Sequence, residues 1–453
     1  MQSMNRMLPW AWLIVSALAY AALLYTTPRT AFGQLLLWFG LLFVGYAWMM
    51  QQGSDTTESS PWLRPRWIIA IGLGFRLIAL FALPEMSDDY FRFVWDGRLL
   101  AAGENPFDLL PSAYLAQPEQ MLRIGLDEAL FSRLNSPEYF TIYPPVLQAI
   151  FWLGAWLSPN SIYGHVLVMK SVVFLAEAGT LLLLLRLLKA WGKPLHWLGW
   201  YAWNPLVIVE LIGNLHFEAL MIFGLIWALW EWQQGRWLRS ALPFAIAVGS
   251  KLLPLMLMPL MIRRLGWAKA IFWGLAVAGL CLLMAIPLFD LETVQNLLAS
   301  VDLYFRKFEF NASVYYLVRW AGFQAAGYNI IQQAGPILAL LTVGGICALA
   351  FLQRPVTIEN LPKAMFWALG LYLLLASIVH PWYTTTLVAL ACLSRFRFAM
   401  VWSGMAVLSY FAYRTSAYEE SLWLVALEYG VVLACLGWEL WGSRRQQLGT
   451  DRK

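Results

Sequence analysis

The chain has 453 residues, of which 60% are hydrophobic and only 13% are charged, against roughly 25% charged in an average soluble domain. So few polar groups could not cover a water-facing surface, which excludes a soluble globular protein and predicts an all-α polytopic membrane protein. The net charge of +5 comes from 31 basic and 26 acidic residues spread along the chain, so no nucleic-acid-binding tail is expected.

Apolar stretches of about 20 residues predict the membrane-spanning helices, and lysines and arginines mark their cytoplasmic ends. The first stretch is interpreted as a retained helix rather than a cleaved signal peptide, because another stretch follows at once. The predicted spans are residues 8–25, 32–50, 67–83, 162–188, 197–212, 217–232, 270–289, 332–352, 364–379, 384–395, 398–413 and 422–441. They give about 12 crossings, with both termini in the cytoplasm.

Residues 143–157 are apolar but do not fit as a simple crossing. They begin at Tyr143 with two prolines, and a crossing here would place Lys189 and Lys193 outside the cell. We therefore expect a helix at the outer membrane surface. This interpretation makes residues 85–160 one large external loop.

Residues 241–262 have arginines before and after them, so both ends are expected in the cytoplasm. Lys251 and Pro254 lie in the middle of this stretch, where they disfavour a straight membrane helix. The pattern predicts a broken or re-entrant hairpin with Lys251 near its tip.

Ionisable groups at helix ends or at membrane depth are costly, so they indicate where function lies. The first cluster of such groups opens the external loop. Asp88, Arg92 and Asp96 are four residues apart and can pair along one helix face. We interpret them as a salt-bridge ladder at the surface, which leaves Asp89 as the free carboxylate.

Three further groups fall on the external face of the predicted topology. The second contains Glu210, Asn214, His216 and Glu218, and the third contains His380, Trp382 and Tyr383. A weaker group follows residue 289 and consists of Tyr304, Arg306, Lys307, Glu309, Asn311 and Arg319. The structural alternative is that Glu210 and Asn214 tie helices together and that His216 is only a hydrogen-bond donor. Lys251 could serve packing as easily as a phosphate contact.

This constellation suits the transfer of a sugar from a lipid phosphate to a hydroxyl group. A carboxylate takes the hydroxyl proton as general base, and cations or an imidazolium stabilise the departing phosphate. Aromatic rings pack against sugar faces. The activated donor supplies the energy, and the sequence contains no Walker-type loop or Rossmann fingerprint.

The motifs occur in a fixed order along residues 67–383. They are Asp89 with Arg92, Trp95-Asp96-Gly97-Arg98, Gly103-Glu104-Asn105-Pro106-Phe107, Tyr143-Pro144-Pro145, Asn204-Pro205 with Glu210, Gly213-Asn214 with His216, Lys251 with Pro254, and His380-Pro381-Trp382-Tyr383. This ordered set resembles the GT-C superfamily of integral membrane glycosyltransferases, and within it the bacterial polyprenyl-phosphate-mannose-dependent mannosyltransferases. Residues 67–453 would then be the catalytic domain. The two helices of residues 1–66 depart from the resemblance, because the family's core begins with the helix that leads into the catalytic loop.

The resemblance implies inverting transfer of a hexose, with mannose favoured, from a polyprenyl-phosphate donor to a lipid-linked or envelope glycan. The site would face the outside of the inner membrane. Asp89 matches the general base, with Asp88 in reserve. The resemblance places His380, Arg98, Arg92 and Lys251 near the donor phosphate, and Glu210, Asn214, His216, Tyr143, Trp382, Tyr383 and Asn311 near the substrates. No cofactor is expected, and a divalent metal held by Asp88 and Asp89 ranks below a metal-free site.

The main alternative is a transporter or flippase for a lipid-linked sugar, in which the same charges would line a pathway. Transporters often consist of repeated halves, and no internal repeat is found here. A scaffolding subunit of an envelope assembly would not need such a constellation on one face. The enzymatic interpretation requires Asp89 and His380 to share one cavity.

Overall fold

A computed structural model describes residues 2–52, 61–288, 293–297 and 308–450 of the chain. Tyr304, Arg306 and Lys307, which belong to the weaker predicted cluster, lie outside these described residues. Within the described ranges all regular elements are helices, apart from one isolated bridge between Phe310 and Ile378. The prediction of an all-α polytopic membrane protein is confirmed.

The chain forms two compact units. The first unit consists of Met1–Phe75, Leu184–Ile208 and Glu309–Lys453, and the second consists of Arg76–Leu183 and Val209–Phe308. The helices of residues 1–52 therefore belong to the first unit together with the C-terminal helices.

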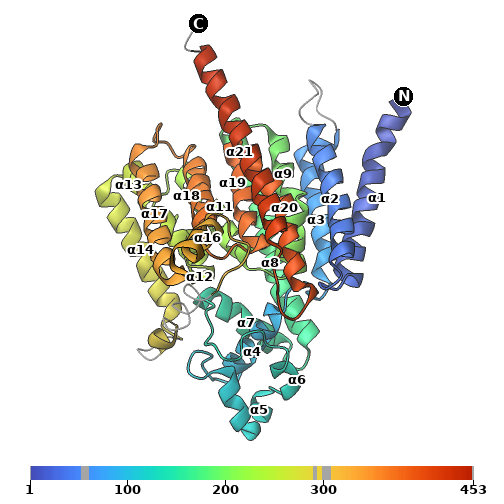
Figure 1. Cartoon of the computed structure of the whole chain (residues 1–453), viewed down its shortest axis with the longest axis vertical. Coiled ribbons are helices and arrows are strands. Elements are labelled where there is room, and N and C mark those ends of the chain that lie inside the picture. The colour runs from blue at the N-terminus through green and yellow to red at the C-terminus, as the bar shows by residue number, and fades with distance from the viewer. Residues whose placement is uncertain (1, 53–60, 289–292, 298–307, 451–453) are drawn as a thin grey trace. The chain divides into compact units, whose positions relative to one another are not determined.

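In the first unit, α1 packs against α2, α17 against α18, α18 against α19, and α20 against α21 (Figure 1). The helices that begin in this unit are α1 (Gln2–Thr26), α2 (Phe32–Gln51), α3 (Pro65–Leu80), α9 (Leu198–Ala202), α10 (Pro205–Val207), α16 (Val314–Ala326), α17 (Ile331–Leu352), α18 (Leu361–Leu375), α19 (Thr385–Ser394), α20 (Phe398–Met405) and α21 (Leu422–Thr450). Short 3₁₀ segments cover Pro61–Leu63, Leu195–Trp197, Pro381–Thr384 and Ala406–Arg414.

In the second unit, α4 packs against α7, α11 against α12, and α12 against α14. The α-helices are α4 (Asp89–Ala101), α5 (Pro118–Ile124), α6 (Glu128–Phe131), α7 (Pro145–Leu157), α8 (Ile162–Ala190), α11 (Glu218–Gln233), α12 (Ala241–Ser250), α13 (Ile262–Leu265) and α14 (Trp267–Ala285). The 3₁₀ segments are Pro111–Ala116 and Leu253–Met261, and Ile208–Gly213 forms a π-helix. The last residues of α8 and the first residue of the π-helix belong to the first unit.

Six helices of the described residues are long and apolar enough to cross a membrane. They are Met7–Thr26, Phe32–Gln51, Ile162–Ala190, Trp267–Ala285, Ile331–Leu352 and Leu422–Gly442. The bent pair Pro205–Gly213 and Glu218–Gln233 adds a seventh if it is one broken span. The other predicted spans form helices of 16 residues or fewer, as α3, α18, α19 and α20 do. Short or broken helices are tolerated in a membrane protein where other protein segments bury them, so length alone identifies fewer crossings than the predicted count of about 12.

The predicted loop of residues 85–160 is a folded layer that contains α4, α5, α6 and α7 (Figure 1). α7 begins at Pro145, whose missing N–H costs nothing at a helix start. Gly97 of α4 allows the close packing of this layer, because a Cβ atom there would lie 2.3 Å from the carbonyl oxygen of Phe151. Gly154 of α7 leaves room for the His165 ring in the same way. Gly97 and Gly154 therefore set how closely α4 and α7 approach each other and α8.

The predicted break within residues 241–262 is confirmed. α12 ends at Ser250, and Lys251 follows in an extended conformation with φ −159° and ψ 133°. The chain then continues as the 3₁₀ segment Leu253–Met261, which contains two prolines that cannot supply the N–H of a regular helix.

Candidate active site

Asp89 is the first residue of α4, where a negative charge is favoured by the helix dipole. Its Oδ1 accepts a hydrogen bond of 2.6 Å from Nδ2 of Asn135. The description of Asp89 as a free carboxylate is therefore corrected: it has an amide partner in the loop that precedes α7. The amide of Asn135 carries no charge, and Asp89 makes no ion pair among the described residues.

The electrostatic surroundings of Asp89 all lie in the second unit. Burial raises the pKa of Asp89 above its ordinary value of 3.8. The charge of His216 and the hydrogen bond from Asn135 oppose this rise, whereas the charges of Asp88 and Glu218 add to it. Asp89 itself is half-buried. The carboxylate is thus a stronger base than an ordinary aspartate.

Asp96 and Arg92 form a buried ion pair rather than part of a surface ladder. Nε of Arg92 lies 2.8 Å from Oδ1 of Asp96, and both side chains are almost fully enclosed. Oδ2 of Asp96 also accepts hydrogen bonds from Thr141 at 2.6 Å and from Gln148 at 3.1 Å. The prediction of a surface ladder was wrong because α7 packs against α4, and Thr141 and Gln148 enclose the pair.

The remaining contacts of Arg92 hold the loop that carries Asn135. Its Nη1 donates hydrogen bonds to the carbonyl oxygens of Ser136 at 3.2 Å and Tyr139 at 3.0 Å. Arg98 similarly donates a 2.6 Å hydrogen bond to the carbonyl oxygen of Gly125. Burial lowers the pKa of Arg98. These contacts give both arginines a structural role, and their predicted contacts with a donor phosphate stay predictions.

The second predicted cluster lies on a local irregularity of the backbone. Glu210 is part of the π-helix Ile208–Gly213, a rare form that is frequently found at functional sites. Its Oε2 accepts a 3.1 Å hydrogen bond from Asn214 and lies 3.1 Å from Nδ1 of His216. Leu215, between these two partners, has a φ of +60°, a value that costs a residue with a side chain roughly 1–2 kcal/mol. The turn therefore positions His216 through a left-handed conformation at Leu215, which is unfavourable for that residue by itself.

Aromatic packing joins the two clusters. Phe93 lies one helical turn after Asp89, and its ring centroid is 5.3 Å from that of Phe217, the neighbour of His216. Tyr143 packs edge-on against Phe93 at 5.0 Å and against Phe151 at 5.5 Å. Tyr143 therefore packs beside α4, and its predicted contact with substrate stays a prediction.

Lys251, at the break after α12, forms an ion pair with Glu218 at the start of α11. Glu218 is buried and Lys251 is about one third exposed. Glu218 belongs to the second predicted cluster, where the sequence assigns it no role, and Asn135 belongs to no predicted cluster. No local pattern identifies Asn135, because it meets Asp89 across 46 positions of sequence.

His380, Trp382 and Tyr383 belong to the first unit, at the start of the 3₁₀ segment before α19. The imidazole of His380 stacks on Trp382 with ring centroids 4.3 Å apart and an interplanar angle of 3°. Phe310 stacks on His380 at 4.7 Å. The backbone bridge holds this arrangement, because Val379 donates a 2.8 Å hydrogen bond to the carbonyl oxygen of Phe310.

Asn311 is buried in the same unit and has a φ of +47°. Its side-chain amide donates hydrogen bonds to both carboxylate oxygens of Glu428, at 3.3 and 3.2 Å. Tyr429 donates a 2.7 Å hydrogen bond to its carbonyl oxygen. These bonds fix the segment beside His380 to α21, and the predicted contact of Asn311 with substrate stays a prediction.

Fold and site together define the class: a multi-pass helical membrane protein with a carboxylate site built on the folded layer that connects α3 to α8 along the chain. Among the described residues, no group of three or more His, Cys, Asp or Glu side chains is placed to hold a metal ion. The expectation of a metal-free site stays a prediction.

The family model of the alpha-(1→6)-mannopyranosyltransferase N-terminal domain matches residues 7–268, more than half of the chain. The chain therefore belongs to this family of mannosyltransferases and is a glycosyltransferase, as the sequence resemblance predicted. The match begins at residue 7, so it includes the two helices that the resemblance had left outside the family's core. Its name describes a transferase rather than a transporter or flippase. No curated protein and no solved structure matches the chain.

Proposed function

We propose that this mannosyltransferase moves a mannosyl unit from a polyprenyl-phosphate donor to a hydroxyl group of a lipid-linked or envelope glycan. The reaction takes place at the external face of the inner membrane and inverts the configuration at the anomeric carbon. The observation that carries this proposal is the half-buried carboxylate of Asp89, whose pKa is raised and whose charge is left without an ion pair among the described residues.

In the proposed reaction Asp89 accepts the proton of the acceptor hydroxyl as that oxygen attacks the anomeric carbon. The bond from the anomeric carbon to the phosphate oxygen breaks on the opposite side of the sugar. The leaving polyprenyl phosphate keeps the electron pair. Asn135 orients the carboxylate through its hydrogen bond. Asp88 is the alternative base.

The departing phosphate needs cations close to it. We propose Lys251 and His380 for this role, with Arg98 at the edge of the site. The contact between Lys251 and Glu218 would hold the lysine at the helix break until a donor arrives. Glu210, Asn214 and His216 would bind the sugar or place the acceptor, with Tyr143, Trp382 and Tyr383 packing against sugar faces. This scheme uses no metal ion, and a divalent metal bound by Asp88 and Asp89 is the alternative.

The test is purified full-length protein in lipid nanodiscs with a membrane glycolipid extract as acceptor, supplied in turn with polyprenyl-phosphate mannose, glucose and arabinose. Released polyprenyl phosphate is the readout. We expect release from the mannose donor, and a loss of about 10² to 10⁴ in rate for Asp89→Asn with donor binding retained. The matched control is Glu119→Gln, which neutralises an exposed carboxylate in α5 of the same layer.

Near-normal turnover by Asp89→Asn would remove Asp89 as the base. An inactive Asp88→Asn beside an active Asp89→Asn would transfer the role to Asp88. Absence of lipid phosphate release from all three donors would overturn the donor class itself.

A further inference from the structure

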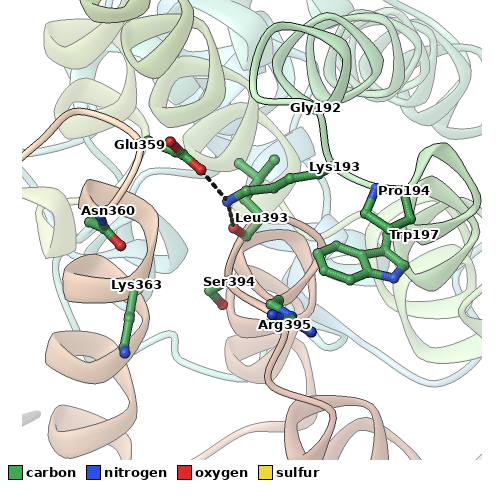
Figure 2. Close-up of a pocket in the computed structure, with 10 residues that line it drawn as sticks. All are labelled: Gly192, Lys193, Pro194, Trp197, Glu359, Asn360, Lys363, Leu393, Ser394 and Arg395. Atoms are coloured by element: carbon green, nitrogen blue, oxygen red, sulfur yellow. Dashed lines mark hydrogen bonds and ion pairs between the residues drawn. The ribbon is translucent and has the colours of Figure 1, made fainter. Parts of the chain in front are cut away.

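A cavity of about 470 Å³ lies in the first unit, and none of its lining residues takes part in the proposed reaction. Three separate segments line it: the chain after α8, the start of α18 and the end of α19 (Figure 2). α8 and α17 are two of the membrane-length helices, and each ends a few residues before a lining loop. The cavity therefore lies where spanning helices leave the hydrocarbon, which is the level of phospholipid headgroups.

The lining is predominantly cationic. Lys193, Lys363 and Arg395 carry positive charge, and Glu359 is the one carboxylate among the lining residues. The cavity thus has a surplus of two positive charges. Burial lowers the pKa of Lys193, and the charge of Arg395 lowers it further, although Glu359 raises it. Like charges held this close favour an anion between them.

One of the three cations is already engaged. Nζ of Lys193 donates a hydrogen bond to the carbonyl oxygen of Leu393 and lies 3.9 Å from Glu359, as the dashed lines in Figure 2 show. This contact satisfies the C-terminal end of α19.

Lys363 and Arg395 remain available to a ligand. Within the described part of the chain, neither makes an ion pair. Each lies over an aromatic ring instead: Lys363 is 5.7 Å from the centroid of Phe396, and Arg395 is 5.7 Å from that of Trp197. An aromatic face holds a cation in place without taking up its hydrogen-bond donors.

Two neutral features of the lining also suit an anion. The hydroxyl of Ser394 is enclosed and has no hydrogen-bond partner among the described residues. α18 begins beside the cavity with no side-chain hydrogen bond capping its first turn, so the positive end of its dipole adds to the positive charge of the lining.

We infer that this cavity binds a phosphate group, held by Lys363, Arg395 and Ser394. The group belongs either to an anionic phospholipid of the surrounding leaflet or to a soluble phosphate compound. A basic pocket between membrane helices is a known form of anionic headgroup site, and the fork of an arginine matches phosphate oxygens. This function is separate from mannosyl transfer and does not rest on the proposed mechanism.

The test measures lipid retention by native mass spectrometry on the purified full-length protein. Phosphatidic acid and phosphatidylglycerol are compared with phosphatidylcholine. A second arm measures the thermal unfolding midpoint in detergent with inorganic phosphate against chloride at equal ionic strength. The variant is Lys363→Gln with Arg395→Asn, because residue 395 has a φ of +75° that asparagine tolerates. Lys189→Gln, an exposed lysine in the last turn of α8 outside the cavity, is the control.

We expect the wild type and Lys189→Gln to retain anionic lipid in preference to phosphatidylcholine, and the double variant to lose about tenfold in affinity. If only the soluble arm responds, and the double variant abolishes the response, the ligand is a soluble phosphate. Equal retention and equal midpoints in all proteins would overturn the proposal. Ser394→Ala, which leaves both charges in place, serves if the double variant does not fold, and a binding profile unchanged from wild type would then count against the site.

Discussion

At the scale of single residues, the carboxylate of Asp89 depends on partners that lie far from it in sequence. Its pKa is lowered by His216, on the turn before α11, and by Asn135, in the loop before α7, against the rise caused by burial. The pairing of Arg92 with Asp96 beside Asp89 was predictable from the sequence, because that spacing is a local pattern, whereas the role of Asp89 as the base stays a prediction. The identity of Asn135 was not predictable, since only the folded loop brings it within reach.

The raised pKa of Asp89 predicts the acid limb of the pH profile. A base must be ionised, so activity falls as the pH drops through its pKa, and the limb of kcat/KM should lie above the ordinary value of 3.8. His216→Gln removes a charge that lowers this pKa. We therefore expect the limb to move to higher pH in His216→Gln, measured as initial rates of lipid phosphate release. His196→Gln, a histidine of the first unit, should leave the limb unmoved, and a shift to lower pH in His216→Gln would contradict the assignment.

At the scale of helices, local chemistry explains some elements and tertiary packing decides others. Lys251 is costly at membrane depth and Pro254 disfavours a continuous helix, so the break after α12 was predictable. Helix α4 was predicted as a pairing stripe, but the burial of its Arg92–Asp96 pair depends on α7, about 50 residues later in the chain. The π-helix that carries Glu210 left no sequence signal that we could identify.

The close contact between α4 and α7 predicts that one added methyl group lowers the stability of the protein. Gly97→Ala would place a Cβ atom 2.3 Å from the carbonyl oxygen of Phe151 and 2.7 Å from the His165 ring. Overpacking of this kind costs typically about 1–3 kcal/mol, so we expect a lower thermal unfolding midpoint in detergent. Gly74→Ala in α3 is the control, because a Cβ atom there meets nothing within 4 Å. Equal midpoints for the two variants would show that the helix contact is looser than described.

At the scale of the whole molecule, composition alone was enough to predict a helical membrane protein, and the motif order was enough to predict the family. The number of crossings was not recoverable by length, because helices such as α19 and α20 have 10 and 8 residues. The division into two units also left no mark on the sequence, since each unit is assembled from segments far apart in the chain.

The predicted topology can be checked with single cysteines. After replacement of the four native cysteines, Ser132→Cys tests the layer of residues 85–160, and Lys189→Cys tests the end of α8; both positions are exposed. We expect a membrane-impermeant maleimide to label position 132 in intact cells and position 189 only after permeabilisation. The reverse pattern would invert the orientation and move the proposed reaction to the cytoplasm.

The left-handed backbone of Leu215 has a consequence for handling the purified protein. Its side chain is fully buried, so hydrophobic packing acts together with the hydrogen bonds around Glu210 to maintain the turn that presents His216. A solubilising agent that loosens this packing would release the turn while most helices persist. Circular dichroism would then report an intact sample that has lost its competence for transfer, and turnover is the better guide when detergents are compared.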